Sequence, residues 1–124
     1  MRNLNMHDQM IVELAILKTM DNYKRLANDA KEEEISDIYM EDREQFSQLL
    51  VLIRKQEFAS AQRKFRRMDT SQREELFYTD YSKIGIRTLY PTIFLRREEV
   101  QRVLCDFFDV EVRHPNKGRR HDDE

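Results

Sequence analysis

Two stretches decide the fold of this 124-residue chain: residues 8–28, DQMIVELAILKTMDNYKRLAN, and residues 32–55, EEEISDIYMEDREQFSQLLVLIRK. Neither stretch contains glycine or proline, and the chain has no residue of either type before Gly85. Because tight turns usually require such residues and a sheet needs many turns, their absence favours helices. Apolar residues recur every three or four positions in both stretches, as on one face of a helix. We therefore predict an all-α fold built on a long antiparallel helical hairpin.

The second stretch has one apolar stripe that we expect to face the core. A single acidic residue, Asp42, interrupts that stripe. A carboxylate facing a core must be paired, solvated or neutralised. We expect Lys24, Arg25 or a backbone amide as its partner, with a wet edge between helices or a polar pocket as alternatives. The apolar members of the stripe are Ile35, Tyr39, Phe46, Leu50 and Ile53.

About three shorter helices are expected to pack on the hairpin. The apolar stripe changes phase after the second stretch, which predicts a bend or break near residues 54–57 and a helix over residues 57–68. The sequence Ser71-Gln72-Arg73-Glu74 matches a capping box and predicts a helix over residues 72–79. The last expected helix covers residues 96–108.

Outside these helices the pattern is weaker. Ile84, Ile86, Thr88 and Tyr90 occupy alternate positions, which suits a short extended segment. Val110 and Val112 also alternate, so a minor two-stranded β contact stays open as an alternative to irregular chain. We expect residues 1–112 to form a single helical domain. Residues 113–124 are polar and are expected to be a disordered tail.

The composition is typical of a folded protein from a reducing compartment. Apolar residues make up 40% of the chain and charged residues 37%, with seven Phe, five Tyr and six Met, whereas disordered chains lack large apolar residues. Cys105 is the only cysteine, and we expect it to be a packed core thiol. No run approaches the roughly 18 apolar residues of a membrane span. We therefore expect a cytoplasmic protein without a membrane contact.

The first stretch carries apolar residues on two faces. Val12, Ile16 and Met20 follow one face, and a second group follows the other. A helix that is apolar on two faces must be covered on both. This helix is therefore either central in the domain or half covered by a second copy. The residues through which we expect self-association are Met10, Leu14 and Leu17.

A basic segment lies within an otherwise acidic chain. Residues 54–67, RKQEFASAQRKFRR, contain six basic side chains and one acidic one, whereas residues 1–53 carry a net charge of −5. Clustered Arg and Lys attract phosphates, so nucleic acid is one candidate partner. An acidic protein surface is another, and a solvated amphipathic helix is the simplest interpretation. The basic residues are Arg54, Lys55, Arg63, Lys64, Arg66 and Arg67.

Two more specific sites are disfavoured. The acidic face of the second stretch lies opposite its core stripe, and no Glu-x-x-His motif accompanies it, so a solvated face is a better interpretation than a metal site. A helix-turn-helix is also disfavoured, because its second helix would present Glu74 and Glu75 to DNA. The residues of the acidic face are Glu34, Asp37, Glu41 and Glu44.

No catalytic, cofactor-binding or metal site is indicated. The chain has no Gly-rich phosphate loop, no cysteine pair and no Gly-x-Ser-x-Gly motif, and nothing indicates a small-molecule substrate. The leading hypothesis is a small non-enzymatic interaction or regulatory protein that acts through protein contacts and self-associates. Adaptors of this kind occur in bacteria and in phages. The alternative is a nucleic-acid-binding accessory protein that uses residues 54–67.

Overall fold

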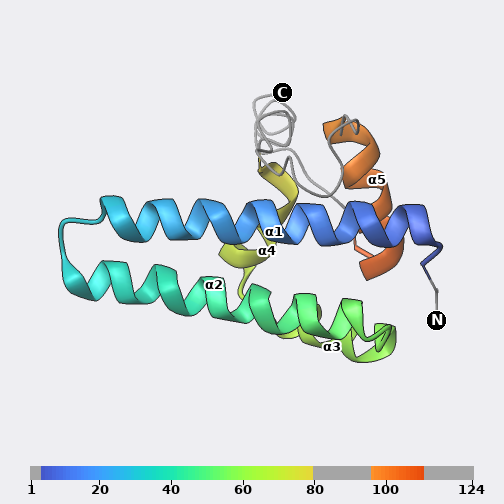
Figure 1. Cartoon of the computed structure of the whole chain (residues 1–124), viewed down its shortest axis with the longest axis horizontal. Helices are drawn as coiled ribbons and strands as arrows, with labels where there is room; N and C mark the ends of the chain where they lie inside the picture. Colours follow the sequence, from blue (N-terminus) through green and yellow to red (C-terminus); the bar gives the residue numbers. More distant parts are fainter. Residues whose placement is uncertain (1–3, 80–95, 111–124) are drawn as a thin grey trace, which may run out of the picture.

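The protein is all-α, as predicted. A computed structural model describes residues 4–79 and 96–110, and within these ranges it contains helices and no strands. A long hairpin of two helices carries three shorter ones (Figure 1). The helices are α1 (Met6–Asp29), α2 (Glu33–Arg54), α3 (Phe58–Arg67), α4 (Thr70–Tyr78) and α5 (Arg97–Phe108).

Some predictions fall outside the described ranges. The expected β contact needs residues 84–90 and Val112, and the expected disordered tail is residues 113–124. That residues 1–112 form one domain stays a prediction. None of the five described helices combines the length and the hydropathy that crossing a membrane would require.

The hairpin follows from local sequence signals. The side-chain oxygen of Asn5 accepts a hydrogen bond from the Asp8 amide at 2.7 Å, which caps the free amino end of α1. At the other end the chain reverses over residues 30–32, and α2 runs back beside α1 (Figure 1). Glu33 and Glu34 occupy the first turn of α2, where negative charge stabilises the helix dipole.

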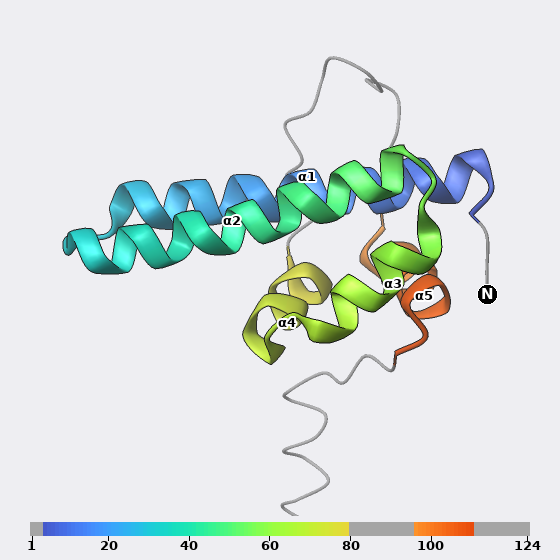
Figure 2. The ribbon, with the colours of Figure 1, turned by 90° about the horizontal axis from the view of Figure 1, so that it is seen from below.

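The predicted break after α2 is confirmed. The chain leaves the helix at Lys55, and Gln56 adopts a left-handed backbone with φ of 60°. Ile53 before the break and Phe58 after it are both buried. Because a straight helix would aim these two side chains in different directions, the chain must turn for both to reach one core. As a result α3 folds back beneath α2 (Figure 2).

The helix α4 begins earlier than the sequence indicated. Its capping box pairs Asp69 with Gln72, and the Asp69 amide donates to the side-chain carbonyl oxygen of Gln72 at 3.0 Å. The prediction that Ser71 opens this helix is therefore wrong. Met68, which directly follows α3 as its C-cap, is buried and has an extended backbone, so the chain turns there and the next helix can start at once.

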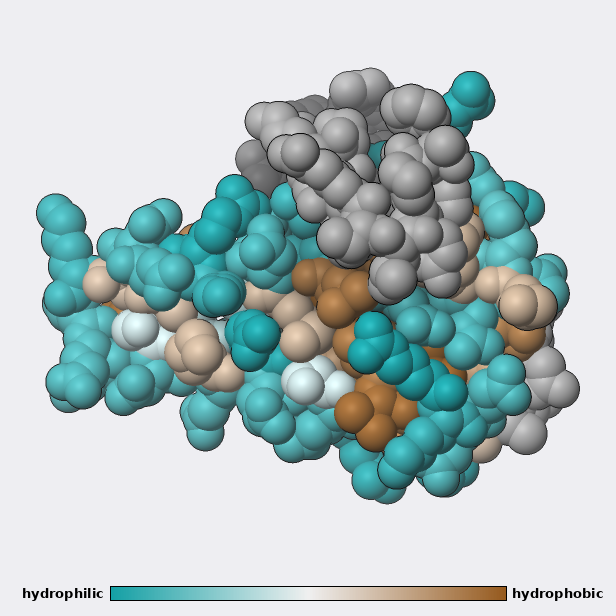
Figure 3. All heavy atoms as spheres, viewed as in Figure 1, coloured by the Kyte–Doolittle hydropathy of each residue, from teal (hydrophilic) through white to brown (hydrophobic). Residues whose placement is uncertain are grey.

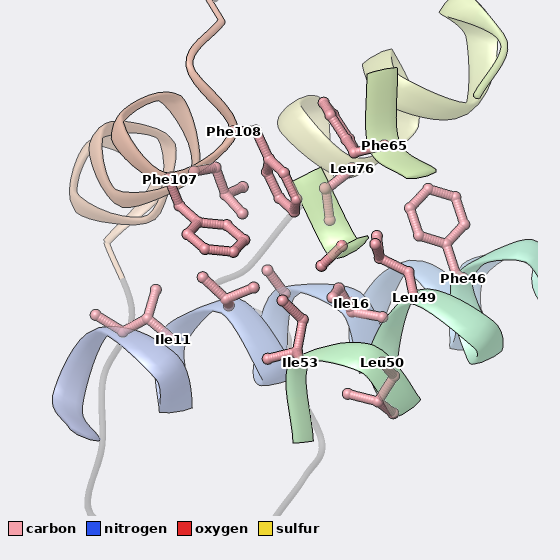
Figure 4. Packing of buried hydrophobic residues seen from close by; sticks show 14 of the residues in the cluster. Ile11, Ile16, Phe46, Leu49, Leu50, Ile53, Phe65, Leu76, Phe107 and Phe108 are labelled. Atoms are coloured by element: carbon pink, nitrogen blue, oxygen red, sulfur yellow. The ribbon is translucent and has the colours of Figure 1, made fainter. Parts of the chain in front are cut away.

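The core lies between the hairpin and a second layer made of α3, α4 and α5 (Figure 2). Phenylalanines from the second layer pack on one another above the hairpin (Figure 4). The rings of Phe65 and Phe108 stack with centroids 4.1 Å apart, and Phe58 meets Phe107 edge to face at 5.6 Å. Such pairs stabilise a core beyond the burial of their area.

The second layer covers only part of the hairpin. The end of the hairpin that contains the α1–α2 connection projects beyond α4 (Figure 2). We call this end, residues 24–42, the arm. Ala27 is its only buried residue. The expectation that Ile35 belongs to the core is wrong, because this residue is 40% exposed.

Candidate interaction surfaces

The structure divides the six basic residues of the predicted site into two groups. Arg54 and Lys55 precede the break, and the Nε of Arg54 lies 3.2 Å from a carboxylate oxygen of Glu13 on α1. The other four residues lie on α3. That helix therefore carries the main basic surface, and Arg54 helps to hold α2 against α1. The four residues are Arg63, Lys64, Arg66 and Arg67.

The three arginines of α3 form what we call the α3 basic surface. Arg63, Arg66 and Arg67 are exposed, and none of them makes an ion pair within residues 4–79 and 96–110. Lys64 differs, since its ammonium donates to the side chains of Gln45 at 2.8 Å and Gln48 at 3.1 Å on α2. Three guanidinium groups thus stay available to an outside partner.

An open groove of about 690 Å³ lies beside this surface, between α2 on one side and α3 and α4 on the other. Its α2 wall contains Glu41 and Asp42, and its α3 wall contains Arg63, Lys64 and Arg67. Across the groove, no ion pair joins these walls among the described residues. We call this the α2–α3 groove. Its α2 wall is acidic and its α3 wall is basic, so a ligand in the groove would meet both charges.

Asp42 takes a partner that sequence reasoning missed. Its carboxylate accepts a hydrogen bond from the side-chain amide of Gln72 at 2.7 Å, which is none of the expected partners Lys24, Arg25 or a backbone amide. Its place beside an open groove agrees with the alternative of a wet edge between helices. Arg25 instead lies 3.7 Å from Asp21 on its own helix. Asp42 points towards α4 because it lies on the side of α2 that the second layer covers, at the edge of the α2–α3 groove.

The arm carries most of the exposed apolar surface of the described residues. Of six large apolar side chains that are exposed there, four lie on the arm and only Met6 and Val51 lie elsewhere. Sequence reasoning missed these residues as a site, although their position among acidic neighbours in residues 35–41 was a readable signal. The four are Leu26 at 38% exposure, Ile35 at 40%, Ile38 at 51% and Met40 at 43%.

Two of these side chains flank the helix α4. Ile38 borders the α2–α3 groove, and Leu26 borders a second groove of about 580 Å³ between α1 and α4. Ile35 is one helical turn before Ile38 and therefore lies on the same side of α2. We call Leu26, Ile35 and Ile38 the arm apolar surface. It continues the hairpin face on which α4 packs, whereas the opposite face of the arm is mostly hydrophilic (Figure 3).

An acidic row runs along α2 beside Ile38, on the side of the helix that faces away from the core stripe. Glu34, Asp37 and Glu41 are exposed, at helical spacings of three and four residues. Residues 29–44 as a whole contain eight acidic and two basic side chains. The described residues contain no group of three or more His, Cys, Asp or Glu side chains that could hold a metal ion. The row therefore gives the arm a strong negative field.

The predicted self-association residues lie elsewhere. Leu14 is only 4% exposed within the single chain, and Met10 and Leu17 are half-buried and pack against the core. One chain thus already covers most of the second apolar face of α1. Self-association through these three residues stays a prediction, and the larger exposed apolar surface is on the arm.

Burial shifts the pKa values of two titratable groups inside the fold. Burial raises the pKa of the Tyr23 hydroxyl far above its ordinary value, with Asp42 nearby adding to the shift, and its ring stacks on Phe46 with centroids 5.8 Å apart. Burial also raises the pKa of Glu75, and a hydrogen bond with Asn22 opposes that shift. Cys105 is half-buried and packs against the core.

Comparison of the chain with known protein families, curated proteins and solved structures finds no match. The function must therefore be argued from the surfaces described above.

Proposed function

We propose that this protein is a small non-enzymatic interaction or regulatory protein that binds a protein partner through the arm. The observation that carries the proposal is the overhang of the hairpin beyond α4, which leaves Leu26, Ile35 and Ile38 exposed on a core-facing side. Contiguous apolar surface with a polar rim is typical of protein interaction sites. Acidic residues beside it add selectivity for a partner of opposite charge.

The energetics favour a role in binding rather than in folding. Full burial of an isoleucine contributes about 1.5–3 kcal/mol, and a half-exposed one gains only part of that in the free chain. A partner that covered the three side chains would gain the remainder at each of them. The arm apolar surface therefore provides a driving force that the isolated chain leaves unused.

Site-specific photo-cross-linking tests this proposal. A photoreactive amino acid at position 38, in the protein expressed in its native cells, is expected to capture a protein. The matched control is position 51, because Val51 is 46% exposed and lies on a different face of the same helix. Equal yields from the two positions, or no protein captured from positions 26, 35 and 38, would contradict the proposal.

A second candidate function is nucleic-acid binding. It is favoured by Arg63, Arg66 and Arg67, which are exposed and lack ion-pair partners in the described part of the chain. If the α3 basic surface binds phosphates, labelled DNA or RNA is retained in low salt and released steeply as salt rises. Reversing Arg63 and Arg67 to Glu abolishes that retention, whereas reversing Arg97 and Arg102 on α5 does not. No retention in low salt would end this candidate.

A further inference from the structure

We propose that the arm of one chain docks against α3 of a second copy, so that two chains form a symmetric dimer. This inference rests on the proposed function and names the partner of the same surface. It assigns the acidic row Glu34, Asp37 and Glu41 to the α3 basic surface of the other copy. The arm apolar surfaces of the two copies then meet at the centre of the contact.

The shape of the molecule favours a second copy as the occupant. The hairpin forms one layer and α3–α5 a second, but the second layer ends short of the arm (Figure 2). Under a two-fold axis near Ile38, each arm lies beside the α4 end of the other chain and fills the missing part of its second layer. A two-fold contact uses the same patch twice, so every residue buried on one copy is also buried on the other.

The charges favour the same arrangement. Each chain carries an acidic row on its arm and three exposed arginines on α3, and both border the α2–α3 groove through Glu41, Arg63 and Arg67. Within one chain the described residues contain no ion pair between the row and the arginines. A second copy that lies antiparallel across Ile38 brings its Glu34 and Asp37 towards these arginines. Because of the two-fold symmetry, the acidic row of each copy then lies near the arginines of the other copy.

The apolar residues favour this partner over a nucleic acid. Ile38 is 51% exposed and borders the same groove as Arg63 and Arg67, so an occupant that fills this groove contacts an apolar side chain as well as the arginines. A second arm supplies both the apolar and the acidic groups that the groove surface requires.

Sedimentation velocity on the full chain, with charge-reversed variants, tests the dimer. The wild type is expected to reach twice the mass of a single chain as its concentration rises, and added salt is expected to weaken that association. One variant carries Asp37→Lys and Glu41→Lys, and the other carries Arg63→Glu and Arg67→Glu. Each variant alone is expected to sediment with the mass of one chain. Its arm and its α3 now carry the same charge, so the arm of one copy repels α3 of the other.

Mixing the two variants gives the decisive result. In the mixed pair, the basic arm of one variant faces the acidic α3 of the other, and the two unchanged surfaces also face each other. The mixture is therefore expected to recover the dimer mass, which a misfolded variant could not do. The matched control carries Arg97→Glu and Arg102→Glu on α5, both exposed, and is expected to remain dimeric.

Three outcomes would overturn the dimer: a wild type that keeps the mass of one chain at the highest concentration, charge-reversed variants that still dimerise, or a mixture that fails to recover. The photo-cross-link from position 38 separates this failure from that of the proposed function. If position 38 still captures a different protein, only the dimer is wrong. If positions 26, 35 and 38 all capture nothing, the proposed function is wrong as well.

Discussion

Gln72 joins the amino end of α4 to α2 through both ends of its side-chain amide. The amide oxygen accepts from the Asp69 backbone at 3.0 Å, and the amide nitrogen donates to Asp42 at 2.7 Å. Gln72 is 7% exposed, so both bonds are largely shielded from water. Capping of α4 and its docking beside the arm therefore depend on the same residue.

The position of the cap gives a prediction at the residue scale. Asp69→Ala removes the side-chain acceptor at the start of α4 and is expected to lower the free energy of unfolding by about 1 kcal/mol. Ser71→Ala lies inside the helix and is expected to change it by less than about 0.5 kcal/mol. Urea unfolding of the two variants measures both values. A larger loss from Ser71→Ala would show that the helix starts where the sequence motif suggested.

Glu75 gives a prediction about pH. Burial raises the pKa of its carboxyl above the ordinary value of 4.5, so the folded chain holds this proton more tightly than the unfolded chain. The resulting stabilisation is complete below pH 4.5 and is lost as the pH rises through the folded pKa. Glu75→Gln removes the charge, and is therefore expected to raise the free energy of unfolding, relative to wild type, more at neutral than at acidic pH.

Urea unfolding of Glu75→Gln across this pH range checks the sign. Glu74→Gln is the control, because Glu74 is the exposed neighbour on the same helix. A difference from wild type that does not change with pH would contradict the assignment of the shift to Glu75.

At the scale of elements, two buried glutamines connect the helices of the second layer. The side-chain amide of Gln62 on α3 donates to the Phe107 carbonyl at 2.7 Å, and that of Gln101 on α5 donates to the Phe77 carbonyl at the same distance. Both carbonyls lie in the last turn of their helices, where no intrahelical donor is available. These bonds satisfy helix ends that packing has removed from water.

The break between α2 and α3 gives a prediction at this scale. Gln56 has a φ of 60°, a conformation that costs a residue with a Cβ about 1 kcal/mol or more and costs glycine little. Gln56→Gly is therefore expected to raise the melting temperature slightly. Glu44→Gly at an exposed position within α2 is the contrasting control and is expected to lower the free energy of unfolding by about 1 kcal/mol. Destabilisation by both changes would contradict a left-handed residue at the break.

At the scale of the whole molecule, stability is unevenly distributed. Residues 46–53 of α2 contribute four side chains to the core, whereas the arm buries only Ala27. Regions with few buried contacts open locally at a lower free energy than the core does. The arm is thus held in its folded conformation only by the packing of α1 against α2.

Hydrogen exchange tests this difference. In dilute protein the amides of residues 24–42 are expected to exchange through local opening, and those of residues 46–53 only through global unfolding. A dimer built on the arm adds a second expectation, that exchange in the arm slows as protein concentration rises. Equal protection of the two segments in dilute protein would contradict the uneven burial.

Much of the fold could be predicted from local patterns in the sequence. The absence of glycine and proline before residue 85, the apolar spacing and the phase change near residue 55 were enough to place the hairpin and the break, because helix formation depends on neighbouring residues. The error of two residues at the start of α4 arose where two capping sequences overlap. The burial of Met68, which belongs to tertiary packing, selected the earlier one.

The candidate site could be predicted only in part. The sequence by itself determined that α3 is basic and that α2 begins with an acidic face, since charge and helical spacing are local properties. It could not determine which apolar stripes are covered. Ile35 and Ile53 share one stripe with the same spacing, yet Ile35 is 40% exposed and Ile53 is fully buried. Only the tertiary structure decided this, because burial requires a second layer above the residue, and here that layer ends at α4.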